Sequence, residues 1–328
     1  MIFHTFTMAD ITRWPQCCRI PCVPADLMNP RLVENSRFAR TPKARAVRRR
    51  SLALLSLALT LLPLSANSGE KAADKSREAW PTAVRAHYRL HFNGIEVGHL
   101  DINSSTSPNT YSLSGSGKVS VLFGVITWSG SSRVSGTIEG GAPVPKTYAF
   151  DWRNNRKGGK IRIGFKDRVA TEVAVTPPPG ANPDLVPLTP AHKVGALDPV
   201  SAIMMLTKAD DRPPCDRRVG IFDGKQRYDI VLTYKGMIRL PPPSSGGPSV
   251  IAYVCRAMYE PIAGHRANAA TKTYASNRDV EVVLRRIPGS EMLIPHSVTI
   301  PTFWGTGSMV TERIDIVTAT AGEIALTK

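Results

Sequence analysis

Cysteine, aromatic residues and acids are all scarce in this chain of 328 residues. Only 7% of the residues are aromatic, and 42 lysines and arginines outnumber the 26 acids. No Gly-x-Ser-x-Gly turn of a serine hydrolase and no glycine-rich phosphate loop occurs, so neither enzyme class is indicated. Of the five cysteines, Cys215 and Cys255 lie far apart in the sequence with no histidine pair beside them, which does not predict a zinc site.

The segment from Lys43 to Ser68 has the three-part layout of a secretory signal peptide. A cluster of one lysine and four arginines precedes an apolar run of about 14 residues, and small residues close the segment. A membrane-spanning helix needs about 20 apolar residues. We therefore predict that residues 43–68 are a cleaved signal peptide and that the protein is periplasmic or secreted. An uncleaved N-terminal anchor is the alternative.

The remaining N-terminal residues are set aside from the fold. Residues 1–42 form an unusually long leader, with Met28 as an alternative start, and residues 69–82 are predicted to be a flexible lead-in. Residues 83–325 then form a single β-rich domain. Residues 1–68 hold 10 of the 42 bases and 3 of the 26 acids, which leaves a net charge of +9 on residues 69–328. Such a cationic surface attracts anionic partners.

The cysteines divide in the same way. Cys17, Cys18 and Cys22 lie in the leader, so Cys215 and Cys255 are the only cysteines of the exported part. An even number of cysteines in an oxidising compartment indicates a disulfide. Two free buried thiols are the alternative.

From Val84 onward, apolar and polar residues alternate with a period of two, which predicts half-buried β-strands. Asn93-Gly94 is a strong hairpin signal, and it would set His91 opposite Glu96. The apolar parity then flips, which predicts a β-bulge at Gly98-His99. About a dozen short strands separated by turn signals are typical of a sandwich or a barrel-like antiparallel sheet.

One helix is predicted near residues 198–208. Asp198 suits the N-cap and Pro199 suits the first helical position. The apolar residues that follow are spaced as on one face of a helix: Val200, Ile203, Met204 and Leu206. The predicted fold class is therefore mainly β: a large, curved antiparallel sheet, sandwich-like or barrel-like, with one packed helix.

Several segments occur in an order that resembles a known family. They are the Asn-Gly hairpin within Tyr88–Gly98, Val186-Pro-Leu-Thr-Pro190 before Leu197–Ala202, Ile221-Phe-Asp-Gly224 with Tyr228-Asp229, and Tyr253-Val-Cys255 leading to Ile262-Ala-Gly264. Over most of residues 80–320 the chain resembles the DUF3108 family of exported bacterial proteins of unknown function. The resemblance implies a signal-bearing, β-rich envelope protein, and it brings no catalytic residues with it.

Catalytic and metal-binding patterns are weak. Ser201, Asp198 and His192 can be written as a nucleophile, an orienting acid and a base, but helix capping by Asp198 is the simpler interpretation. His87 and His91 lie about 13 Å apart along one strand, too far to share a metal ion. We predict no metal and no cofactor.

A basic hairpin is the first candidate binding surface. Seven cations lie within 16 residues, with one acid among them: Arg153, Arg156, Lys157, Lys160, Arg162, Lys166 and Arg168. Such a face would attract lipid headgroups or other anionic envelope polymers. The alternative is a solvated sheet surface on which lysines discourage edge-to-edge pairing.

An aromatic stripe is the second candidate. Its members are predicted to line a site for a lipid-like ligand between the curved sheet and the helix: Tyr88, Phe92, Tyr148, Phe150 and Trp152. The alternative is that these side chains fill the core.

These patterns favour a non-catalytic binding or structural protein for a lipid-like or anionic envelope component. Peripheral membrane association fits the same charge, and nucleic acid does not fit an exported protein. Two alternatives stay open: an enzyme that acts on envelope polymers, with Asp101, Asp151 and Glu172 as candidate acids, and a protein-interaction module of an envelope complex. No pattern indicates an oligomeric state.

Overall fold

The computed structural model describes residues 80–121, 124–209, 213–242, 249–287, 290–319 and 322–327. The predicted leader and signal peptide, and most of the predicted lead-in, lie outside these residues. All described residues belong to one compact unit, residues 72–328. None of the helices in the described ranges is long and apolar enough to cross a membrane.

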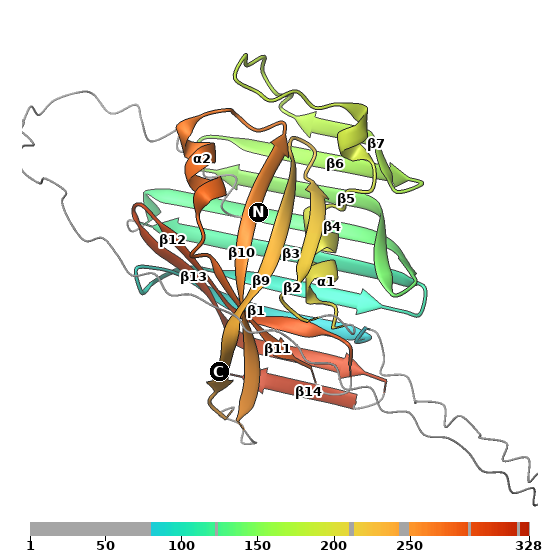
Figure 1. Cartoon of the computed structure of the whole chain (residues 1–328), viewed down its shortest axis with the longest axis vertical. Helices are drawn as coiled ribbons and strands as arrows, with labels where there is room; N and C mark the ends of the chain where they lie inside the picture. Colours follow the sequence, from blue (N-terminus) through green and yellow to red (C-terminus); the bar gives the residue numbers. More distant parts are fainter. Residues whose placement is uncertain are drawn as a thin grey trace, which may run out of the picture. The chain divides into compact units, whose positions relative to one another are not determined.

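The described residues form fourteen strands and two α-helices (Figure 1). The first seven strands form a meander: β1 Ala83–Phe92, β2 Ile95–Thr106, β3 Thr110–Val121, β4 Ile126–Glu139, β5 Ala142–Asn154, β6 Gly158–Lys166 and β7 Val169–Thr176. A 3-10 turn, η3 Pro190–Lys193, and helix α1 Pro199–Thr207 follow. The remaining elements are β8 Arg217–Phe222, β9 Arg227–Leu240, β10 Val250–Ala263, α2 Ala269–Ser276, β11 Glu281–Arg286, β12 Leu293–Thr302, β13 Gly305–Thr318 and β14 Gly322–Thr327.

All fourteen strands belong to one antiparallel sheet, in the order β7-β6-β5-β4-β3-β2-β1-β13-β12-β11-β10-β9-β8, with β14 beside β13. One edge of β13 is shared, because residues 305–310 pair with β12 and residues 313–318 pair with β14. The sheet branches at this point. In Figure 1, β9 and β10 run across β2–β6 at a steep angle, so the later strands form a second layer.

A short segment before helix α1 bridges the two ends of this sheet. Val194 pairs with Val169 of β7, and Leu197 pairs in parallel with Ile221 of β8. The Leu197 N–H donates to the Gly220 carbonyl oxygen at 2.9 Å. The sheet is therefore nearly closed, and the predicted mainly β, barrel-like fold class is confirmed.

Aromatic side chains fill the space between the layers. One core cluster contains Trp80, Tyr111, Trp128, Tyr148, Phe150 and Phe222, and helix α1 adds Val200 and Met204 to it. Trp80 is only 5% exposed, so the packed domain includes residue 80, which lies before the predicted start at residue 83. It also runs past residue 325, because β14 ends at Thr327.

The local predictions on β1 and β2 are confirmed, except for the position of the β-bulge. Asn93 and Gly94 form the turn with φ values of 50° and 80°, and His91 lies opposite Glu96. The predicted bulge at Gly98-His99 is misplaced: Leu90 pairs with Gly98 and His91 with Glu96, so Val97 is the extra residue.

The predicted disulfide is also present. Cys215, just before β8, and Cys255 of β10 are bonded with a Cα–Cα distance of 5.2 Å. Both cysteines are fully buried in a core cluster with Leu232, Leu284 and Leu293. The disulfide therefore links the start of the second layer to its third strand.

Candidate binding site on the outer face

The register of β2–β6 aligns outward-facing side chains in rows across the sheet, because residues two apart on a strand share a face. One row contains His99, Lys118, Ser129 and Arg153. The next row contains Asp101, Ser116, Ser131, Asp151 and Lys160. Ser129 thus lies between Lys118 and Arg153 in the first row. In the second row, Ser116 and Ser131 lie between the two carboxylates, Asp101 and Asp151.

This arrangement of short and long side chains produces an open groove of about 990 Å³, here called the outer groove. Its floor includes Ser116, Ser129 and Ser131. Its margins carry one imidazole, two carboxylates and six cations: His99, Asp101, Asp151, Lys118, Arg153, Arg156, Lys157, Lys160 and Arg162. A smaller hollow of about 280 Å³, also lined by Lys118, Ser129 and Arg153, continues it toward the β3–β4 turn.

The two carboxylates of the outer groove are already engaged. Asp151 accepts two hydrogen bonds of 2.9 Å from the Arg162 guanidinium, and Asp101 Oδ1 lies 2.6 Å from His87 Nδ1. Four other groove cations form no ion pair with any carboxylate of the described residues: Lys118, Arg153, Arg156 and Lys160. The groove therefore has a surplus of positive charge that suits an anion.

The structure divides the predicted basic face. Arg153, Arg156, Lys157, Lys160 and Arg162 all line the outer groove. Lys166 and Arg168 do not line it, because they lie at the opposite end of β6. Arg168 pairs there with Glu139 at 3.0 Å. The role of the five groove cations as an anion-binding face remains a prediction.

Sequence reasoning missed the other half of the groove. Lys118 is an isolated cation in a strand of serines and glycines, and His99 is in none of the predicted sites. The run of serines at every second position from Ser112 to Ser116 is the one signal that indicates a small-residue face. That these residues meet Arg153 and Lys160 depends on register across four pairs of strands.

The aromatic stripe does not come together in one place. Tyr88 packs with Ile314 and Ile316 in one cluster. Tyr148 and Phe150 lie in another, with Trp152 packed against them. Phe92 is half-buried near the β1–β2 turn. Three of the five are buried core residues, which favours the interpretation that they fill the core.

The Asp198–Ser201 pair is a buried helix cap. Asp198 Oδ1 accepts from the backbone N–H groups of Val200 and Ser201, and the Ser201 hydroxyl donates to Oδ2 at 2.5 Å. Tyr111 Oη lies 2.6 Å from Ser201 Oγ. Desolvation by complete burial raises the pKa of Asp198 to about 6, although these hydrogen bonds lower it. His192 instead accepts from the Thr189 N–H, so capping is the supported interpretation.

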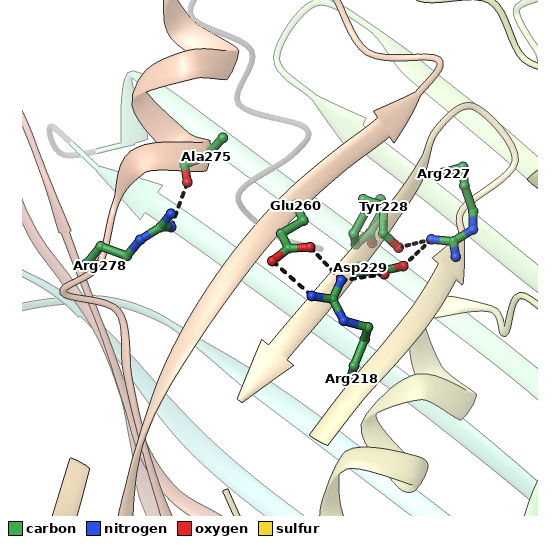
Figure 2. Close-up of polar contacts among 7 residues, drawn as sticks. All are labelled: Arg218, Arg227, Tyr228, Asp229, Glu260, Ala275 and Arg278. Carbon is green, nitrogen blue, oxygen red and sulfur yellow. Dashed lines mark hydrogen bonds and ion pairs between the residues drawn. The ribbon is translucent and has the colours of Figure 1, made fainter. Parts of the chain in front are cut away.

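A second charged cluster lies on the outer side of β8, β9 and β10 (Figure 2), here called the arginine cluster. Arg218 donates to Asp229 at 2.8 Å and to Glu260 at 2.5 and 3.2 Å. Arg227 donates to the other oxygen of Asp229 at 2.5 Å. A Cβ at Gly220 would lie 2.5 Å from the Arg227 guanidinium, so the glycine makes room for that side chain. Both arginines are matched by carboxylates, so this cluster ties three strands together.

The fold and the groove together define a barrel-like antiparallel β protein with an open cationic surface. The chain belongs to the DUF3108 family, described as a protein family of unknown function, whose profile matches residues 87–310. Among solved structures, the chain is similar to a β-barrel-like protein of a domain of unknown function, DUF1849, from Brucella abortus. That likeness has 10% identity and a TM-score of 0.45, and it covers 73% of this chain and 99% of that chain. A comparison with curated proteins finds no match.

Proposed function

We propose that this protein is an exported, non-catalytic binding protein whose outer groove binds an acidic polysaccharide of the cell envelope. One observation carries the proposal: in a groove of about 990 Å³, cations without described carboxylate partners flank a floor of serine hydroxyls. Cations attract carboxylate or phosphate groups. Hydroxyls both donate and accept hydrogen bonds, as sugar hydroxyls do.

The shape of the groove supports a polymer over a small ligand. Its lining runs from His99 on β2 to Arg162 on β6, four strand spacings or about 19 Å. Trp152 adds no aromatic platform to it, because its side chain shares the inner face of β5 with Phe150 and packs against the core. A lipid-like ligand finds less support, because the aromatic stripe fills the core.

The carboxylates of the groove do not favour glycoside hydrolysis. Asp101 and Asp151 belong to one row and are three strand spacings apart, about 14 Å between backbones. The carboxyl groups of glycosidases are about 5 to 9.5 Å apart. Asp151 is also bound by Arg162, and Glu172 does not line the groove.

The test is binding of the purified chain to polygalacturonate, with neutral dextran as the comparison polymer. Retention on polygalacturonate that falls with salt is expected, because exposed charges are screened. The variant R153Q/K160Q should bind about tenfold more weakly, since two exposed charge pairs of about 0.7 kcal/mol each together give about 1.4 kcal/mol.

The matched control is K146Q/K166Q, which removes the same charge outside the groove. It should keep most of the binding. S131L adds bulk to the floor without a change of charge, and it should also weaken binding. Equal losses in both double variants would reduce the effect to net charge and contradict a groove site. Absence of any retention would contradict the proposal as a whole.

A further inference from the structure

The most exposed large apolar side chains of the described residues all lie in or beside the turns at one end of the strands. They are Phe303 (88% exposed), Ile95 (70%), Val125 (69%) and Trp304 (60%). Ile95 follows the β1–β2 turn, Val125 lies between β3 and β4, and Phe303 and Trp304 form the β12–β13 turn. The antiparallel order places these turns, and the β5–β6 turn, at the same ends of their strands (left in Figure 1). We call this the turn edge.

Hydrogen bonds hold these turns in fixed pairs. The Asn93 N–H donates to the Thr306 carbonyl at 2.9 Å, and the Thr306 N–H donates to Asn93 Oδ1 at 2.8 Å. Asn155 of the β5–β6 turn accepts from the Thr127 N–H at 2.5 Å and donates to the Val125 carbonyl at 3.0 Å. The Phe303 and Trp304 rings also touch edge to face, with centroids 5.1 Å apart. The apolar side chains are thus presented on braced turns.

Positive charge stands beside them. Arg156 and Lys157 are exposed in the β5–β6 turn, and Lys118 and Arg153 lie one to three residues from the ends of their strands. The acid nearest to Ile95, Glu96, is paired with Arg89 at 3.0 Å. The turn edge therefore combines exposed apolar side chains with a surplus of cations.

We propose that the turn edge binds the surface of an anionic lipid bilayer. Tryptophan and phenylalanine on separate turns match the headgroup region, where an apolar ring meets water. Cations beside them gain from anionic headgroups. The apolar residues stand on separate turns and not in one flat patch, which suits insertion between headgroups. This inference shares its cations with the margin of the outer groove, but the apolar side chains that would enter the bilayer do not line that groove. Variants of the apolar side chains therefore test it separately from the proposed polysaccharide binding.

Flotation with lipid vesicles tests this assignment. The full chain is mixed with vesicles of 70% phosphatidylcholine and 30% phosphatidylglycerol, or of phosphatidylcholine alone. Every variant keeps the apolar run of residues 51–64, so differences between variants report the turn edge. F303S/W304S should bind anionic vesicles about tenfold or more weakly, because two inserted rings are lost. I95S/V125S provides a second, independent variant.

The matched control is Y234S/M237S. Tyr234 and Met237 are 57% and 59% exposed on β9, away from the turn edge, and their removal should leave vesicle binding unchanged. W304F should keep binding but show weaker quenching by lipids brominated in their acyl chains than the parent does, because Trp304 is removed while the other four tryptophans of the chain are unchanged. Thermal melting checks that each variant is folded.

Three results would overturn the proposal. The first is that F303S/W304S and I95S/V125S bind vesicles as well as the parent chain does. The second is that Y234S/M237S loses as much vesicle binding as these two variants do. The third is that the parent chain sediments as an oligomer, that F303S/W304S dissociates this oligomer, and that vesicle binding persists. The turn edge would then join copies of the chain.

Discussion

The outer groove and the arginine cluster are both rich in arginine and acid, yet they differ in how the charges are matched. In the arginine cluster, Asp229 and Arg227 have only 11% and 17% of their side chains exposed, and Asp229 receives two guanidinium groups. In the groove, Arg153 and Lys160 are exposed and have no described carboxylate partner. Buried charge must be paired to be tolerated. Matched charge therefore indicates structure, and unmatched exposed charge leaves capacity for a ligand.

Removal of the disulfide is expected to change the free energy of unfolding the most. This bond crosslinks only the layer that holds the arginine cluster, so its removal should affect that layer and not the outer groove. C215S/C255S opens a loop of 40 residues, and the chain-entropy relation gives a loss of about 4 kcal/mol in the free energy of unfolding. Urea denaturation measures it. Binding of polygalacturonate by the folded fraction should persist. An unchanged unfolding midpoint would mean that the bond contributes nothing.

Removal of Asp229 is expected to cause the next largest loss in the free energy of unfolding. D229A leaves the nearly buried Arg227 without its carboxylate, which we expect to lower the free energy of unfolding by about 3 kcal/mol. Polygalacturonate binding at a temperature where the variant is folded should be unchanged. Loss of binding in the folded variant would show that the two regions are not separate.

The buried Asp198 should produce a pH dependence that neither surface region explains. Its pKa in the folded protein is about 6, above the 3.8 of an ordinary aspartate, so the folded state holds the proton more tightly than the unfolded state. The stabilisation is complete below about pH 4 and is lost as the pH rises through 6. It amounts to about 3 kcal/mol. Urea denaturation between pH 4 and 7 should show this slope in the parent chain and a flatter one in D198N, which keeps a capping oxygen. Equal slopes would contradict the assignment.

The smallest effect is expected in the groove. R153Q/K160Q changes two exposed side chains without carboxylate partners, so the free energy of unfolding should change by less than about 0.5 kcal/mol. Thermal melting beside the binding assay measures both quantities on one sample. A loss of 2 kcal/mol or more would assign these cations to structure and would remove the contrast with the arginine cluster.

Local chemistry made part of the fold predictable. Asn93-Gly94 specifies a turn and Asp198-Pro199 specifies a helix start by backbone preferences that act within a few residues. Helix α2 was missed because its eight residues bury no side chain and carry no apolar period. Strand β14 extends past the predicted domain end at residue 325, because it is short and carries no clear alternation that marks its end.

The candidate site was predictable only in half. The cations of the β5–β6 hairpin are close in sequence, so their clustering is visible there. Lys118 and the serine floor join them through pairings of β3 with β4 and of β4 with β5. Such register is set by the whole sheet, and a single sequence does not encode it in any short pattern.

The place of β1 in the sheet has a kinetic consequence. The first strand pairs along its whole length with β13, and Arg89 contacts Glu312 across this seam, 223 residues later. Contacts of such sequence separation form slowly, because a long loop must close before they gain anything. The hairpins of the β1–β7 meander join strands that are adjacent in sequence, so they can form early. The seam between β1 and β13 is therefore expected to close late in folding and to limit its rate.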